Sequence, residues 1–178
     1  MADPQSPTSE VIEASARKVI AGAFDAEQSL AVAESLTGGA VASALVGVPG
    51  ASSVFRLGVV SYSTELKHSV LGVSLEQLRE TGPVDAEVAM QMAEGVRARA
   101  ITDAGPCSVA VATTGVAGPG AADGHEPGEF FVGLAWDGGR SAQHHCVSGS
   151  RDEVRAAATI AALDTLRRFI GNLQAVQE

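Results

Sequence analysis

Apolar residues along the chain alternate between helical spacing and strand-like runs. Ile12, Ala16, Val19, Ile20 and Ala23 recur at helical spacing, which predicts an amphipathic helix over 10–24. Similar spacing and polar starting residues predict helices over 40–46, 64–71, 74–81, 85–100 and 151–173. Short runs that are apolar or alternate predict strands over 29–33, 54–62, 107–113, 130–136 and 140–147.

The order of these elements favours one architecture. Helices and strands follow each other without a clean strand–helix–strand repeat, and Asp137-Gly138-Gly139 predicts a hairpin between the last two strands. This order predicts an α/β fold, a three-layer α/β/α sandwich with a mixed sheet. Residues 1–8 are polar with two prolines and are expected to form a disordered tail, with one domain over 9–178.

Composition, charge and the absence of targeting segments add four expectations. Of the 178 residues 46% are hydrophobic but only 4% aromatic, so Ala, Val and Leu must fill the core and elements can pack closely. A net charge of −9 with scattered Arg and Lys argues against a nucleic-acid partner. Cys107 and Cys146 fall in apolar runs and predict two buried free thiols. The chain shows no signal peptide and no apolar run long enough for a membrane span, so we expect a cytoplasmic protein that does not bind membranes.

One stretch stands out, Ala33-Glu34-Ser35-Leu36-Thr37-Gly38-Gly39. It lies between a predicted buried strand and a predicted helix, which places Ser35 and Thr37 on a strand-to-helix turn. Free N–H groups at a helix start suit an anion or an oxyanion, and Gly38 and Gly39 allow close approach. A hydroxyl at this turn could serve as a nucleophile; alternatively, Ser35 or Thr37 caps the helix.

The residue types best suited to chemistry are Ser35, Tyr62 and Lys67. A serine hydroxyl becomes a good nucleophile when a neighbouring base removes its proton, and a lysine can be that base when burial lowers its pKa. Tyr62, the single tyrosine, ends a predicted strand and could orient the amine or relay the proton. The alternative is that Lys67 is a solvated helix lysine.

Metal and nucleotide-cofactor motifs are missing. His144-His145 lies in a predicted strand, so the two side chains should point to opposite faces, and no spacing typical of metal ligands occurs. The glycine-rich loop over 114–120 lacks the G-x-G-x-x-G spacing and is not followed by a Walker lysine. We therefore predict neither a metal nor a cofactor. The loop continues through Ala121 to Gly128, and its 15 residues over 114–128 are more than a simple connection needs, which suggests a functional role.

Several of these segments together resemble one family. The stretch over 33–39 resembles the A-E-S-C-T-G-G motif of the CinA C-terminal domain family, the nicotinamide-nucleotide amidohydrolases. Four later segments also resemble that family's motifs in the same order: Pro49-Gly50-Ala51-Ser52, residues 58–73 with Tyr62-Ser63 and Lys67, Thr114-Gly115-Val116-Ala117-Gly118-Pro119, and Ser148-Gly149-Ser150-Arg151 with Arg155. The resemblance extends from about 29 to 166 and indicates the stand-alone form of the family.

The resemblance implies hydrolysis of the carboxamide of nicotinamide mononucleotide to nicotinate mononucleotide and ammonia. Ser35 would be the nucleophile, Lys67 its general base and Tyr62 an assisting group. Oxyanion donors are expected among the backbone N–H groups of Thr37, Gly38 and Gly39 or of Thr114 and Gly115. Arg151 is the candidate for the substrate phosphate, with Arg155 behind it; a solvated or ion-paired arginine is the alternative.

Two positions depart from the family pattern. Leu36 stands where the family usually has Cys, and Glu126-Pro127-Gly128 stands where it has K-P-V-G, with an acidic side chain that would repel a phosphate if it faced one. These departures motivate an alternative, a non-catalytic nucleotide-binding or interaction module of the same fold. An amidase for another substrate is a third. The resemblance and the small, Ala-rich side chains suggest a homodimer or larger homo-oligomer.

Overall fold

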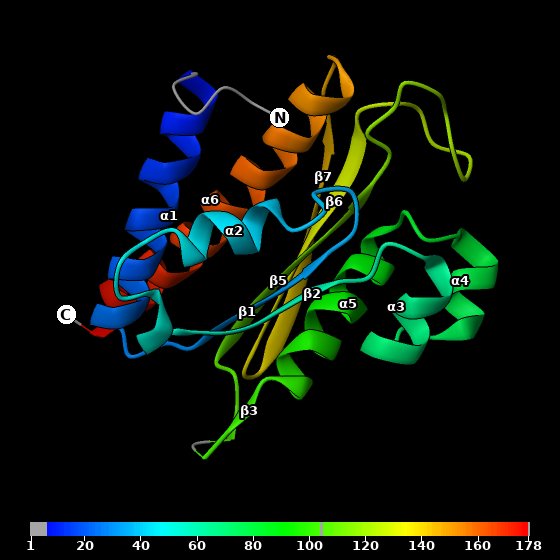
Figure 1. Ribbon diagram of the computed structural model, residues 1–178. Helices are drawn as coiled ribbons and strands as arrows, with labels where there is room; N and C mark the ends of the chain where they lie inside the picture. Colours follow the sequence, from blue (N-terminus) through cyan, green and yellow to red (C-terminus); the bar gives the residue numbers. More distant parts are fainter. Residues whose placement is uncertain (1–6, 104, 178) are drawn as a thin grey trace.

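A five-stranded mixed sheet forms the centre of the molecule (Figure 1). The computed structural model describes residues 7–103 and 105–177. The strand order is β2-β1-β5-β6-β7, where β1 (Leu30–Glu34) pairs in parallel with both β2 (Phe55–Val60) and β5 (Val109–Gly115). β6 (Glu129–Trp136) and β7 (Gly139–Cys146) continue the sheet as an antiparallel hairpin. The carboxyl ends of the three parallel strands therefore share one edge, the usual position of a ligand site in such sheets.

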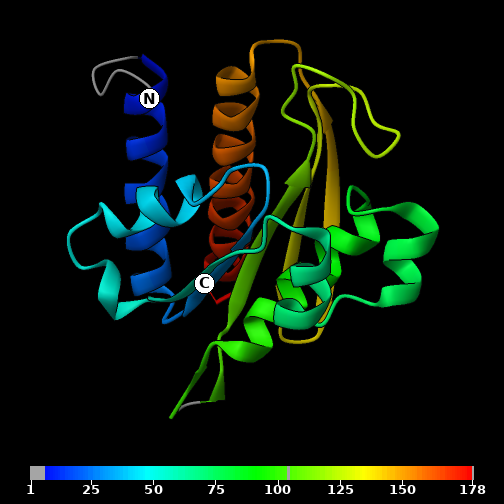
Figure 2. The ribbon, with the colours of Figure 1, turned by 45° about the vertical axis from the view of Figure 1, so that its right-hand side comes forward.

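Helices cover both faces of the sheet (Figure 2). One layer contains α1 (Pro7–Asp25), α2 (Ala40–Val46) and α6 (Arg151–Gln177), and the other contains α3 (Thr64–Leu71), α4 (Leu75–Thr81) and α5 (Ala86–Arg99). The predicted α/β/α sandwich with a mixed sheet is confirmed. None of the helices of the described residues is long and apolar enough to cross a membrane.

Small residues allow the layers to approach closely, as the scarcity of aromatic residues predicted. A Cβ on Gly133 of β6 would lie 2.2 Å from the backbone oxygen of Ala89 in α5. A Cβ on Gly95 of α5 would lie 1.8 Å from the backbone oxygen of Leu71, the last residue of α3. These distances are far below van der Waals contact, so α5 can lie against α3 and β6 only because both positions lack a side chain.

The element boundaries show where the sequence was ambiguous. β5 starts and ends two residues later than predicted, so Thr114 and Gly115 belong to the strand and not to the loop. A two-stranded hairpin of β3 (Ile101–Thr102) and β4 (Gly105–Pro106), and a 3-10 helix, η1 (Ala51–Ser53), were not predicted. α1 begins at Pro7, so 7–8 of the predicted tail are helical, and 1–6 lie outside the described residues.

The prediction of two buried thiols was half wrong. Cys107 is fully buried between the strands, but Cys146 is exposed. Cys146 ends β7, an edge strand of the sheet in which several side chains face solvent.

Replacement of Gly95 tests this close packing. Gly95→Ala should lower the free energy of unfolding by about 2–3 kcal/mol, because α5 must move away from the α3 backbone to admit the methyl group. Gly171→Ala is the matched control, since no heavy atom lies within 4 Å of its added Cβ, and alanine in an exposed helix should leave stability unchanged or raise it by up to about 1 kcal/mol. Urea denaturation measures both, and equal stability of the two variants would contradict the packing argument.

Candidate active site

A cavity of about 290 Å³ opens at the carboxyl ends of β1 and β5. The turn after β1, the start of α3, the α4–α5 connection, the loop after β5 and the start of α6 all contribute to its walls. In Figures 1 and 2 that loop and the first turn of α6 lie at the same end of the sheet. The cavity brings together six of the residues expected to form the site: Ser35, Tyr62, Lys67, Thr114, Gly115 and Arg151.

The buried carboxylate of Glu34 fixes the turn that carries Ser35. Glu34 is 1% exposed, and its two oxygens accept hydrogen bonds from the backbone N–H groups of Gly39 (2.9 Å), Val41 (3.2 Å) and Ala42 (2.8 Å). Three charge-assisted bonds thus satisfy the N-terminus of α2, where the helix dipole also favours a negative charge.

Glu34 therefore makes the bonds that the capping interpretation gave to a hydroxyl. The N-cap residue of α2 is Gly39, and no hydroxyl caps the helix. Ser35 instead borders the cavity with a side chain that takes no part in capping, while its backbone N–H is bonded to the Thr113 carbonyl at 3.0 Å. Sequence reasoning missed Glu34, although a carboxylate at the end of an apolar strand and just before a helix start is a usable signal.

Thr37, Gly38 and Gly39 do not line the cavity, contrary to their predicted role in substrate binding. The hydroxyl of Thr37 is fully buried and bonds to that of Thr113 at 2.8 Å. The N–H of Gly38 donates to the Ser35 carbonyl at 3.1 Å, and that of Gly39 donates to Glu34. Both N–H groups are therefore already hydrogen-bonded within the turn. The two glycines, with φ values of 61° and 97°, allow the turn to adopt its left-handed backbone conformation.

Arg155 also acts on this turn and not on the cavity. Its Nε donates to the Leu36 carbonyl at 3.1 Å and its Nη2 donates to the Thr37 carbonyl at 3.0 Å. The guanidinium thereby binds two carbonyls of the turn that follows Ser35, and it borders the groove between α1, α2 and α6. The expectation that Arg155 backs a phosphate site is replaced by a role in holding the turn.

Lys67 is a buried lysine, which excludes the solvated alternative. Its side chain is 1% exposed, and its Nζ donates to the Ser61 carbonyl at 3.0 Å. Burial lowers the pKa of Lys67 to about 8, against a smaller opposing effect of the Asp123 carboxylate. The N–H of Ser61 donates to the Glu34 carbonyl at 2.9 Å, so one backbone segment connects the lysine to the Ser35 turn.

Tyr62 and Arg151 form a bridge over one side of the cavity. The guanidinium of Arg151, the first residue of α6, donates to the Tyr62 hydroxyl at 2.9 Å and to the Gly118 carbonyl at 2.8 Å. The Tyr62 side chain is largely exposed, at 61%. Both residues therefore sit where a ligand in the cavity meets solvent.

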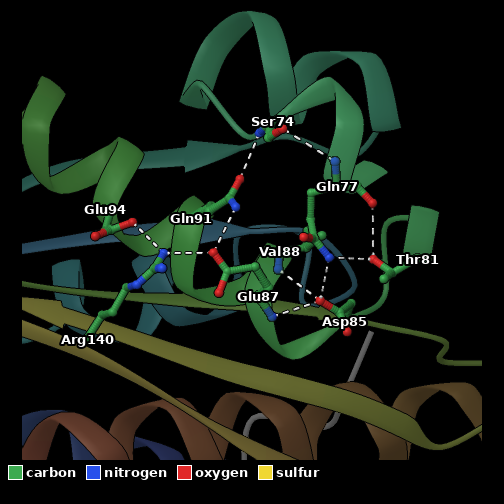
Figure 3. A network of polar contacts seen from close by, with 9 residues as sticks. All are labelled: Ser74, Gln77, Thr81, Asp85, Glu87, Val88, Gln91, Glu94 and Arg140. Carbon is green, nitrogen blue, oxygen red and sulfur yellow. Dashed lines mark hydrogen bonds and ion pairs between the residues drawn. The ribbon is translucent and has the colours of Figure 1, made fainter. Parts of the chain in front are cut away.

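A polar network around Asp85 holds another part of the cavity wall, the connection between α4 and α5 (Figure 3). The Asp85 carboxylate accepts from the N–H groups of Glu87 and Val88 and from the Gln77 side chain, which fixes the connection between α4 and α5. This connection contains Pro83, whose carbonyl accepts a 2.6 Å hydrogen bond from the hydroxyl of Thr114. Thr114 thus joins the end of β5 to this wall. Asp85 is the N-cap residue of α5, in agreement with the helix predicted over 85–100.

The two departures from the family pattern have different consequences. Leu36 is 3% exposed and forms part of the cavity wall, as expected from its position beside Ser35. Glu126 is exposed and does not line the cavity, so its charge does not face a ligand there.

The histidines in β7 do not form a metal centre. His144 stacks on Phe131, whereas His145 stacks on Phe130, on the other face of the sheet. The two side chains therefore point to opposite faces, as predicted. Within 7–103 and 105–177 no group of three or more His, Cys, Asp or Glu side chains is arranged to bind a metal.

Comparison with known protein sequences gives consistent matches. The family model described as the CinA C-terminal domain matches residues 12–170. A CinA-like protein of Frankia casuarinae is 43% identical over 145 residues, and a putative competence-damage inducible protein of Caldanaerobacter subterraneus subsp. tengcongensis is 42% identical over 147 residues. Each alignment covers 82% of this chain but only 32% and 34% of the relative, so the chain spans about a third of the length of these proteins.

Solved structures share both the fold and the chain length. The competence/damage inducible protein CihA of Agrobacterium tumefaciens has a TM-score of 0.81 at 33% identity, covering 88% of this chain and 93% of that one. A CinA superfamily protein of Klebsiella pneumoniae has a TM-score of 0.84 at 27% identity, covering 90% and 98%. With the family model matching most of its length, this chain belongs to the CinA family and carries the family's C-terminal domain.

Proposed function

We propose that this protein hydrolyses the carboxamide of nicotinamide mononucleotide, giving nicotinate mononucleotide and ammonia. The observation that carries the proposal is the buried amine of Lys67, with its pKa lowered to about 8, in the wall of the cavity that also contains Ser35. A buried lysine that is partly unprotonated near neutral pH is suited to act as a general base. The choice of substrate follows from the family resemblance of the sequence motifs.

Each step of the proposed reaction uses groups that border the cavity. The neutral amine of Lys67 takes the proton of the Ser35 hydroxyl as the serine oxygen attacks the carboxamide carbon. Collapse of the tetrahedral intermediate breaks the C–N bond, and Lys67 returns the proton to the leaving nitrogen, which departs as ammonia. Water, deprotonated by Lys67, then attacks the ester on Ser35. The bond to the serine oxygen breaks, Lys67 returns the proton to that oxygen, and the acid product loses its own proton to solvent to give the carboxylate.

Two backbone N–H groups are available for the oxyanion. That of Leu36, directly after Ser35, has no hydrogen-bond partner among the described residues, and the residue after a nucleophile at a strand-to-helix turn often supplies such a donor. The N–H of Val116, directly after β5, donates to the Glu129 carbonyl of β6. Because successive N–H groups of a strand point to opposite sides, the N–H of Gly115 points away from β6. We therefore propose Leu36 and Gly115 as the donors: Gly115 was among the expected donors, and Leu36 takes the place of Thr37, Gly38 and Gly39.

Arg151 is the proposed partner of the substrate phosphate. It lies at the first turn of α6, where the helix N-terminus adds to the attraction of its guanidinium for an anion. The cavity of about 290 Å³ suits the nicotinamide ring and part of the ribose, which leaves the phosphate near the bridge of Arg151 and Tyr62.

Ammonia release tests the proposal. Purified protein should release ammonia from nicotinamide mononucleotide, and Ser35→Ala should lower kcat by at least about a thousandfold, because no acyl-enzyme can form. Unchanged stability of the variant would show that the fold is retained. Thermal stabilisation of the wild type by the nucleotide without ammonia release would overturn the proposal in favour of a nucleotide-binding module.

Lys67→Met should separate activity from stability. The variant should lose turnover, while its free energy of unfolding at pH 7 should rise by about 1–3 kcal/mol, because methionine fills the site without a buried charge. Below pH 8 Lys67 is protonated in both the folded and the unfolded state, so the buried charge fully destabilises the folded state. Between pH 8 and the ordinary lysine pKa of 10.5 the folded state loses the proton while the unfolded state keeps it, and this destabilisation decreases as pH rises. The gain should therefore shrink as pH rises to 10 in urea denaturation. A variant less stable than wild type at pH 7 would contradict the account.

The pH dependence of kcat/KM should report the same lysine. Since only neutral Lys67 accepts the serine proton, kcat/KM should rise with pH and level off above a midpoint of about 8. Initial rates between pH 6.5 and 9.5 measure it. A profile that is flat across this range would exclude Lys67 as the base.

A further inference from the structure

Asp123 is the carboxylate of the cavity, and neither sequence motifs nor the reaction steps above assign it a role. Among the residues that line the cavity the charged side chains are Lys67, Arg151 and Asp123. Two of the three are cationic. A ligand with a positive group would be repelled by both unless a negative group compensated them, and Asp123 is the lining residue that can do so.

The backbone places Asp123 firmly. Ala122 and His125 exchange two backbone hydrogen bonds, of 3.1 Å and 2.9 Å, around Asp123 and Gly124, whose φ values are 52° and 83°. Two successive positive φ values define a type I′ turn. The ring of His125 contacts the Glu129 carboxylate at 3.0 Å, which ties the turn to the start of β6.

The turn by itself does not require a charge at position 123. Asn-Gly forms type I′ turns at least as readily as Asp-Gly, so the backbone conformation would be kept with an uncharged amide. The carboxylate forms no ion pair or hydrogen bond with the described residues. It also raises the pKa of Lys67, which works against the neutral form that the base needs. A bound cation that offsets this carboxylate would account for all three observations.

We propose that Asp123 is a specificity-determining residue that recognises the positive charge of a pyridinium ring. The inference rests on the proposed function and extends it, because it selects carboxamides on a cationic ring over neutral ones. The substrate would then lie with its ring between Lys67 and Asp123 and its phosphate toward Arg151. Each charged group of the ligand meets a group of opposite sign, and pairing the ring with Asp123 favours the neutral form of Lys67.

The test compares two ligands that differ in ring charge. One is nicotinamide mononucleotide, and the other is its C-nucleotide analogue, in which a planar, neutral benzamide ring replaces the pyridinium. Binding is measured with the Ser35→Ala protein, which lacks the nucleophile and so leaves the substrate intact. The measurement is made by calorimetry at low salt. The Ser35→Ala protein should bind the cationic ligand more tightly than the neutral one.

Asp123→Asn on that background should weaken binding of the cationic ligand by about three- to fivefold and leave the neutral ligand unchanged, as expected of a charge pair made by an exposed carboxylate. The difference should shrink as salt is added. Glu126→Gln is the matched control, because it removes an exposed carboxylate from the same loop outside the cavity, and it should change neither affinity.

The outcomes separate this inference from the proposed function. Equal weakening of both ligands by Asp123→Asn, or no change in either, would overturn the role of Asp123 while the deamidation proposal stands. If neither ligand binds, the proposed function fails and the inference fails with it.

Discussion

The burial of the Lys67 amine is the constraint on which the rest of the site depends. A lysine that is 1% exposed is costly to keep protonated when its amine makes one hydrogen bond to the described residues, to the Ser61 carbonyl. The same desolvation makes the amine a base near neutral pH. Burial of this one side chain thus lowers the stability of the folded protein and raises the reactivity of the amine, a combination common at catalytic sites.

Two further charged residues hold the turn next to this lysine. The carboxylate of Glu34 satisfies N–H groups at the start of α2, and the guanidinium of Arg155 satisfies carbonyls of the same turn. Together they satisfy both the N–H groups and the carbonyl groups that a tight strand-to-helix turn leaves without backbone partners. Ser35 is therefore held in the cavity wall by groups that do not use its hydroxyl, and the hydroxyl stays available for chemistry.

The sequence predicted the layers and the element order because apolar spacing and capping residues, such as Asp85, specify them locally. It also placed Ser35, Tyr62, Lys67 and Arg151 among the site residues, and the structure brings them to one cavity. It did not foresee that Thr37, Gly38, Gly39 and Arg155 lie outside the cavity, because their partners, which include the Glu34 carboxylate and backbone carbonyls of the turn, come together only in the folded turn. Asp123 carried no signal, since Asp-Gly is typical of any tight turn.

Measuring the ionisation of Lys67 is the most direct test of its role as the base for Ser35. Selective isotope labelling and heteronuclear NMR can follow the Nζ resonance of Lys67 against pH, with Lys67→Met identifying the signal. Because the amine is buried, we expect a pKa of about 8, well below the ordinary lysine value of 10.5. A titration midpoint above 10 would show that Lys67 stays protonated at neutral pH and would contradict its role as the base for Ser35.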